Sequence, residues 1–91
     1  MGMTRNELPQ DEADERVRIG ATVRELREAR HLGLDEMANA VKISRPYLSN
    51  IEAGRKPLTP QLLGRIADVL DVRPISIVRP NYFPADEQVS A

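Results

Sequence analysis

The chain has 91 residues, of which 41% are hydrophobic, 30% charged and 3% aromatic, with no cysteine and no tryptophan. This length fits one small domain around one hydrophobic core. The lack of cysteine excludes disulfide frameworks, thiolate zinc sites and cysteine nucleophiles, and it agrees with a reducing compartment. No apolar run approaches the ~20 residues of a membrane span, and the start of the chain has no signal-peptide core, so no membrane association is expected.

The charge is distributed unevenly along the chain. A net charge of −1 and a pI of about 5.8 argue against a nucleic-acid partner, because DNA-binding domains commonly carry a net basic surface. However, residues 1–15 carry one arginine and five acidic residues, and residues 80–91 carry two acidic residues. Residues 16–79 hold twelve Lys/Arg and seven Asp/Glu, a net charge of +5. A basic centre therefore lies between two acidic ends, although solubilising ends could give the same distribution.

The first predicted element is a helix that follows an aperiodic start. Residues 1–10 show no hydrophobic period and are predicted to form a flexible acidic leader. Glu12 precedes Arg16 by four residues, a favourable helical ion pair, so the helix is expected to begin near Asp11. Its apolar face consists of Ile19, Val23 and Leu26, and it is expected to end around residues 30–33.

Two short helices are predicted next, separated by a tight turn. The second helix has a compact apolar stripe formed by Leu34, Met37, Ala38 and Val41. Gly33 is expected to cap it, with Glu36 favoured in its first turn by the helix dipole. Ser44 is a good cap for a third helix over about residues 45–53, in which Pro46 is tolerated in the first turn. Gly54 is predicted to end that helix.

The remaining pattern completes an all-α fold. Thr59 and Pro60 open a fourth helix as its N-cap and first residue. Pro74 is predicted to start a short fifth helix. We therefore predict an all-α, five-helix domain over residues 11–79, followed by a C-terminal tail over residues 80–91.

Two charged residues lie on helix faces that should turn toward the core. Arg27 continues the apolar stripe of the first helix, and Glu52 continues that of the third. A charge that is buried needs a partner, so their opposite signs predict a structural Arg27–Glu52 ion pair. The alternative is that each side chain extends past the edge of its stripe to reach solvent.

The opposite face of the third helix carries a polar ridge. With Leu48 and Ile51 directed inward, the outer face presents a set with Tyr47 at its flank: Arg45, Pro46, Ser49 and Asn50. Arginine can bind guanine, asparagine can bind adenine and serine suits either, so this set matches a reader of the DNA major groove. The alternative is an ordinary solvent-exposed helix face, which often carries Arg, Ser and Asn without binding DNA. The preceding short helix, the turn and the basic pair Arg55-Lys56 favour a helix-turn-helix.

Residues 19–78 resemble the helix-turn-helix domain of the XRE family, the Cro and lambda-type repressors. The resemblance rests on the segments Ile19–Glu28, Met37-Ala38, Ile43-Ser44-Arg45, Leu48–Lys56 and Leu70-Asp71-Val72. It implies a lambda-repressor-like fold of five helices in which Arg27 pairs with Glu52. It also implies binding to a double-stranded DNA operator, usually as a homodimer, to repress or activate transcription. We expect a repressor that lies in the cytoplasm and is associated with the nucleoid.

The same resemblance implies roles for individual residues. Arg45, Pro46, Ser49 and Asn50 would face bases, Tyr47 would lie on bases or backbone, and the basic pair Arg55-Lys56 would contact phosphate. The chain departs from the family pattern at Gly33-Leu34, where a polar cap and glutamine that reach phosphate are common. Backbone N–H groups at that helix N-terminus can still meet a phosphate. Lys42 stands where glycine is usual, so a strained backbone or a different turn is expected.

Other functions receive less support from the sequence. His31 is the single histidine and is expected at the surface, while Asp35-Glu36 are explained by the dipole of the second helix. No phosphate loop and no metal-ligand spacing occur, so we expect no enzyme, no cofactor and no metal.

The main alternative is a protein-interaction module on the same fold, such as a bridging coactivator or an antitoxin with a protein partner held by the chain ends. Apolar residues near the C-terminus predict either a dimer interface or a cap on the monomer's own core: Val72, Ile75, Val78, Tyr82 and Phe83.

Overall fold

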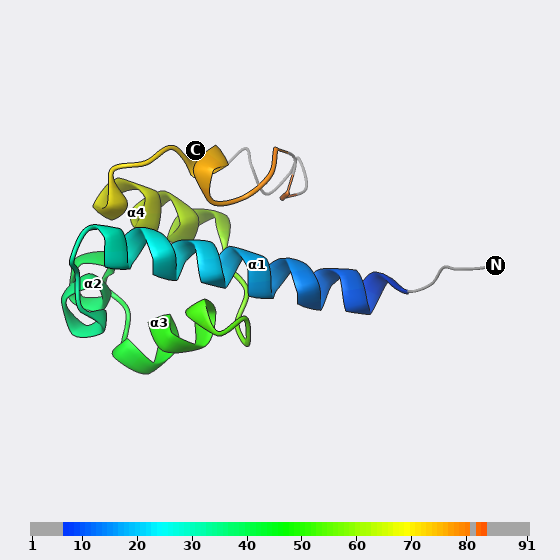
Figure 1. Ribbon diagram of the computed structural model, residues 1–91, viewed down its shortest axis with the longest axis horizontal. Helices are drawn as coiled ribbons and strands as arrows, with labels where there is room; N and C mark the ends of the chain where they lie inside the picture. The colour runs from blue at the N-terminus through cyan, green and yellow to red at the C-terminus, as the bar shows by residue number, and fades with distance from the viewer. Residues whose placement is uncertain (1–6, 81, 84–91) are drawn as a thin grey trace.

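A computed structural model describes residues 7–80, 82 and 83, and it contains four α-helices and one short 3-10 helix (Figure 1). Residues 1–6 of the predicted leader and residues 81 and 84–91 of the predicted tail lie outside the described residues. The helices are α1 (Glu7–Ala29), α2 (Leu34–Val41), α3 (Arg45–Glu52) and α4 (Pro60–Leu70), followed by η1 (Pro74–Ser76). None of the helices in this described part combines the length and apolarity that a bilayer crossing requires.

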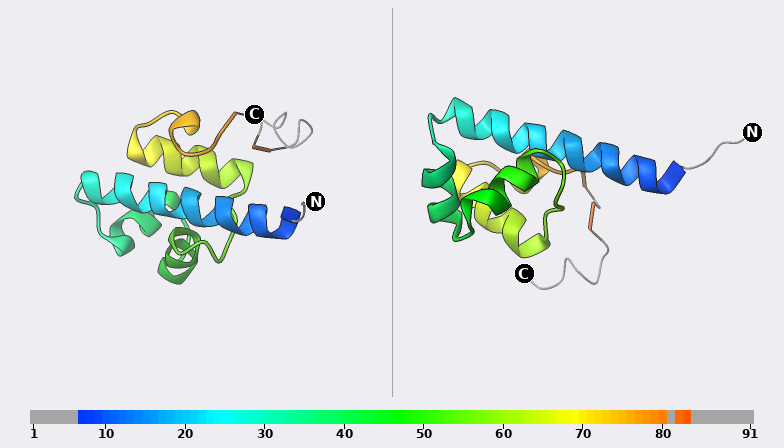
Figure 2. Two further views of the ribbon diagram at one scale, coloured as in Figure 1. Left: turned by 45° about the vertical axis from the view of Figure 1, so that its right-hand side comes forward. Right: turned by 90° about the horizontal axis from the view of Figure 1, so that it is seen from below.

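Helix α1 is longer than the sequence predicted. It begins at Glu7 rather than near Asp11, so residues 7–10 of the expected leader are helical. Pro9 is compatible with this start, because the N–H groups of the first helical turn have no acceptor within the helix. The N-terminal half of α1 projects beyond the other helices in Figures 1 and 2.

The other helices gather beside the C-terminal half of α1, and α3 makes the main contact with it. In Figure 1, α4 lies on one side of α1 and α3 on the other, with α2 beside the C-terminal end of α1. Helix α3 packs against both α1 and α2, and α2 packs against α4. The core takes at least one side chain from every α-helix, and its largest fully buried members are Met37, Leu48, Ile51, Leu62, Ile66, Leu70, Ile77, Val23 and Val41.

The predicted helix caps are present in the structure. The Ser44 hydroxyl accepts a hydrogen bond from the Tyr47 N–H at 3.2 Å, and the Thr59 hydroxyl accepts one from the Leu62 N–H at 3.1 Å. Each bond satisfies an N–H group that the helix itself leaves unpaired. These caps place the starts of α3 and α4 where the sequence indicated.

The segment after α4 differs from the predicted fifth α-helix. Pro74–Ser76 form a single 3-10 turn, in which the Ile77 N–H donates to the Pro74 carbonyl at 2.8 Å. The turn delivers Ile77 and Val78 into the core and leaves Ile75 exposed. Ile77 and Val78 follow the turn directly and are both buried. The helix therefore ends at Ser76, because the chain must turn into the core at that point.

The C-terminal apolar residues mostly cover the core of the monomer. Tyr82 and Phe83 pack against the core, with ring centroids 4.8 Å apart in an edge-to-face arrangement. Burial raises the pKa of the Tyr82 phenol. Val72 is also partly buried against the core and Val78 is buried, so of the five candidates only Ile75 is exposed, at 56%. Four of these five residues therefore cover the monomer's own core, which was the alternative to a dimer interface.

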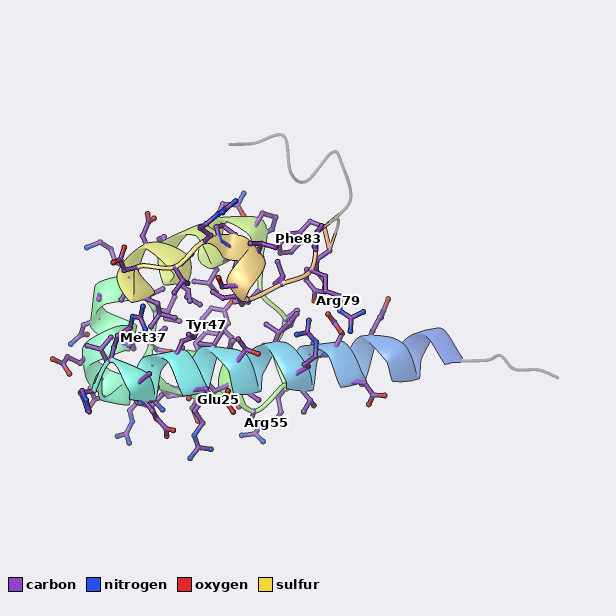
Figure 3. The ribbon with its side chains drawn as sticks, turned by 45° about the horizontal axis from the view of Figure 1, so that its top comes forward. Glu25, Met37, Tyr47, Arg55, Arg79 and Phe83 are labelled. Carbon is purple, nitrogen blue, oxygen red and sulfur yellow. The ribbon has the colours of Figure 1, made fainter. Side chains whose placement is uncertain are left out.

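An ion pair fastens this C-terminal segment to α1. The Glu15 carboxylate lies 3.6 Å from the Arg79 guanidinium and is hydrogen-bonded to Arg18. The bond from Arg18, opposed by burial and assisted by the charges of both arginines, lowers the pKa of Glu15. In Figure 3 Arg79 and Phe83 lie on the opposite side of α1 from Arg55. The segment therefore covers the core away from the loop that follows α3.

Candidate nucleic-acid interface

Helices α2 and α3 are joined by a tight turn over residues 42–44. Lys42 adopts the left-handed conformation, with φ 71° and ψ 45°, as its replacement of the usual glycine predicted. Its N–H donates to the Ala38 carbonyl at 2.8 Å, and the N–H of Ile43 donates to the same carbonyl at 3.0 Å. These bonds close the end of α2, and the Ser44 cap starts α3 directly afterwards. The segment is a helix-turn-helix.

The inner face of α3 is held very close to α1. Leu48 and Ile51 are fully buried, as the spacing predicted. A Cβ atom built on Gly20 of α1 would lie 2.3 Å from the Ile51 carbonyl oxygen and 2.5 Å from that of Glu52. Only glycine allows this approach of the two backbones. Gly20 therefore sets the separation of α1 and α3.

The predicted ion pair between α1 and α3 is present. Arg27 Nε lies 2.7 Å from one Glu52 carboxylate oxygen, and Arg27 Nη2 lies 3.0 Å from the other. The remaining terminal nitrogen donates to the Leu32 carbonyl at 2.7 Å. The two side chains are only 9% and 7% exposed. The bond to Glu52 raises the pKa of Arg27. The two parallel hydrogen bonds of the pair fix the rotation of α3 against α1.

The outer face of α3 places most of the predicted ridge at the surface. Arg45 and Pro46 are exposed, and Ser49 and Asn50 are half-buried. Tyr47 is half-buried because it packs in part against the core. Four members of the predicted set therefore lie on the outer face of α3, whereas Tyr47 is shared between that face and the core.

Both ends of this ridge have partners within the chain that the sequence reasoning missed. Arg45 Nε lies 3.6 Å from the Asp35 carboxylate of α2, and these side chains are 61% and 74% exposed. At the other end, Arg55 Nε donates to the Asn50 side-chain oxygen at 2.9 Å. Neither pair follows helical spacing, because each bridges a helix and a different segment. No periodic signal could have identified them.

The loop after α3 presents the predicted basic pair. Gly54 ends α3 with a φ of 83°, a conformation that glycine adopts freely. Arg16 of α1 donates from Nε to the Gly54 carbonyl at 3.2 Å and so anchors the loop. Arg55 and Lys56 are exposed, and Figure 3 shows Arg55 directed away from the body of the molecule.

The N-terminus of α2 matches the expected departure from the family pattern. The Gly33 N–H donates to the Glu36 carboxylate at 3.2 Å, so Glu36 closes the first turn of its own helix. Leu34 packs partly against the core. His31 is exposed, and within the described residues no three His, Cys, Asp or Glu side chains gather as metal ligands would.

Comparison with known proteins agrees with this geometry. Residues 18–75 match the helix-turn-helix domain family. The 10 kDa protein of the ImmF control region of Bacillus phage phi105 is 40% identical over 55 residues, which cover 60% of this chain and 61% of that protein. The match thus spans about three fifths of that relative's length.

Solved structures give the same picture. The restriction-modification controller protein C.AhdI of Aeromonas hydrophila is similar with a TM-score of 0.67 and 29% identity, over 71% of this chain and 97% of that one. The clp gene regulator ClgR of Corynebacterium glutamicum is similar with a TM-score of 0.67 and 32% identity, over 69% of this chain and 67% of that one. The chain belongs to the helix-turn-helix domain family.

Proposed function

We propose that this chain binds a specific double-stranded DNA operator by inserting α3 into the major groove, and that occupation of the operator represses transcription. In this arrangement Arg45, Pro46, Ser49 and Asn50 meet base edges, with the exposed part of Tyr47 at their flank. The observation that carries the proposal is the fixed orientation of α3. Gly20 and the Arg27–Glu52 pair hold its apolar face inward, so its polar face is presented to solvent.

The charges around α3 support phosphate contacts at the edge of this interface. Arg55 and Lys56 follow α3 directly and are exposed. The N-terminus of α2 adds a helix dipole that favours a phosphate. Asp35 and Glu36 partly oppose it, so we assign most of the backbone affinity to the two basic residues of the loop.

A homodimer is the proposed binding form, because a helix-turn-helix dimer reads two half-sites on one face of the duplex. Ile75 supports a second copy as partner, since it is one of two large apolar residues of the described chain that are strongly exposed. Half-site centres are then expected about 10 bp apart or at a multiple of that spacing. A monomeric mass both free and on operator DNA, at high protein concentration, would contradict the dimer alone.

Selection from a random duplex pool, followed by a salt titration of the selected duplex, tests the proposed function. We expect a defined sequence motif and an affinity that falls steeply with salt, because each neutralised phosphate releases counterions. A protein-interaction module would select no motif and show little duplex binding at physiological salt. That result would reject DNA recognition.

The variant Lys56→Ala tests the proposed phosphate contacts. We expect it to weaken binding to every duplex alike and to lower the salt slope by about one. A loss confined to one sequence would contradict the assignment of Lys56 to phosphate.

A further inference from the structure

The two basic residues of the loop after α3 differ in what they contact. Arg55 is tied to Asn50 twice: its Nε donates to the Asn50 side-chain oxygen at 2.9 Å, and its backbone N–H donates to the Asn50 carbonyl at 2.9 Å. The backbone N–H of Lys56 donates to the same Asn50 carbonyl at 3.3 Å. The sequence suggested one shared role for these residues, but only the Arg55 side chain reaches the ridge of α3.

The bond from Arg55 determines which way the Asn50 amide faces. A side-chain amide has an accepting oxygen at one end and an NH2 group with two donors at the other. The guanidinium is charged, which makes its bond to the oxygen stronger than one between neutral groups. With the oxygen directed toward Arg55, the NH2 group is the end directed away from it.

This orientation changes the base that Asn50 can recognise. Recognition of adenine uses both ends of the amide, the oxygen for N6 and the NH2 group for N7. An adenine N6 donor would have to approach an oxygen that already faces a cationic guanidinium. Guanine presents only acceptors at its major-groove edge, O6 and N7. These acceptors suit the NH2 group and are favoured by the positive charge beside it.

We infer that Arg55 is a positioning residue for base readout: it holds Asn50 as a hydrogen-bond donor, so that this position of the operator selects guanine over adenine. The inference rests on the proposed DNA-binding function. Nε–H is one of five N–H donors of a guanidinium, and the other four belong to the terminal nitrogens. Arg55 can thus hold Asn50 and contact a phosphate at once, which links backbone docking to base selection.

The test compares base discrimination among variants on the selected operator. Asn50→Ala first identifies the base pair that Asn50 reads, as the position whose preference it relaxes. Competition binding then gives the affinity ratio between guanine and adenine at that position for the wild type, Arg55→Ala, Arg55→Lys, Lys56→Ala and the Asn50→Ala/Arg55→Ala double variant. Circular dichroism and urea unfolding verify that each variant is folded.

We expect the wild type to favour guanine by about 5- to 150-fold at that position. Arg55→Ala should lower this guanine-to-adenine ratio to near one. The double variant should have the same ratio as Asn50→Ala alone. Arg55→Lys keeps the charge and therefore the salt slope, but it lacks the fixed planar fork and should lose the ratio as well. Lys56→Ala should weaken all duplexes and leave the ratio unchanged.

Three outcomes would overturn the inference. The first is an unchanged guanine-to-adenine ratio in Arg55→Ala, which would make Arg55 a phosphate contact like Lys56. The second is a preference for adenine at the Asn50-dependent position, and the third is a failure of Asn50→Ala to relax any position. In each case a wild-type protein that still selects a motif leaves operator recognition intact, although the third outcome removes Asn50 from the proposed base contacts. Only the absence of selection by the wild type rejects both.

Discussion

Helix α3 makes one arginine–carboxylate pair on each of its two faces, and the two pairs differ in almost every respect. On the inner face Glu52 binds Arg27 through two hydrogen bonds of 2.7 and 3.0 Å, and neither side chain is more than 9% exposed. On the outer face Arg45 lies 3.6 Å from Asp35, and both side chains are mostly in solvent. A buried pair cannot lose one member cheaply, whereas an exposed pair is weak and can be exchanged for another anion. The inner pair therefore serves the fold, and the outer pair is free to serve binding.

The largest expected effect comes from breaking the inner pair. Arg27→Met leaves the Glu52 carboxylate buried without its partner, which should lower the free energy of unfolding by about 3–5 kcal/mol. Urea unfolding followed by circular dichroism measures the loss. Replacing both partners, Arg27→Met with Glu52→Leu, should recover most of it, since no buried charge is then left. A loss below about 1 kcal/mol in the single variant, the range typical of exposed pairs, would show that the pair is not structural.

A second test on the inner face concerns the close packing of α1 and α3 at Gly20. Gly20→Ala places a methyl group 2.3 Å from the Ile51 carbonyl oxygen, so α1 and α3 must separate. We expect a loss of about 1–3 kcal/mol of unfolding free energy, as for other overpacked sites. Gly64→Ala in α4 is the matched control, because nothing lies within 4 Å of its added Cβ. It should instead stabilise the protein by roughly 0.5–1 kcal/mol. Equal effects of the two substitutions would contradict the close packing.

On the outer face, removal of Arg45 should leave the stability almost unchanged and weaken DNA binding. Arg45→Ala is expected to change unfolding by less than about 0.5 kcal/mol, as exposed substitutions do. It should weaken operator binding by about 1–3 kcal/mol and relax selectivity at one position of each half-site. Fluorescence anisotropy with a set of singly substituted duplexes measures both effects. Arg65→Ala, an exposed arginine of α4, controls for the loss of one positive charge. Wild-type selectivity in Arg45→Ala would remove this residue from the interface.

The smallest effect is expected from Asp35. Asp35→Asn releases Arg45 from its carboxylate and should cost less than about 0.5 kcal/mol of stability, as for Arg45→Ala, which breaks the same exposed pair. It should also raise the affinity for all duplexes, because Arg45 is freed to contact the DNA and one negative charge beside the proposed phosphate path is gone. Glu36→Gln removes a neighbouring negative charge that caps α2 and does not pair with Arg45. If it raises affinity as much as Asp35→Asn does, release of Arg45 contributes nothing.

The sequence predicted the fold well wherever the structure depends on local rules. The stripe Leu34–Val41 gave α2 its bounds, and Ser44, Thr59 and Gly54 cap or end their helices as expected. These are contacts within one turn of a helix, so residue type and spacing are sufficient to predict them. The Arg27–Glu52 pair also follows from spacing, because each charge continues an apolar stripe.

The features that the sequence did not predict depend on how separate elements meet. In the sequence Gly20 is only one residue of a segment that carries the family resemblance, and its role appears when α3 lies against it. The Asp35–Arg45 and Asn50–Arg55 contacts depend on side-chain rotamers across two segments. Pro74 was expected to begin an α-helix, but burial of the following two residues limits the helix to one tight turn. Tertiary packing decides each of these cases.

The left-handed backbone of Lys42 has a consequence for heat resistance. A residue with a Cβ is disfavoured in this conformation by about 1 kcal/mol, a penalty that glycine escapes. The hydrogen bonds that close the turn come from backbone N–H groups, so they do not depend on the lysine side chain. Lys42→Gly is therefore expected to raise the melting temperature of the domain while leaving the other contacts of the turn as they are.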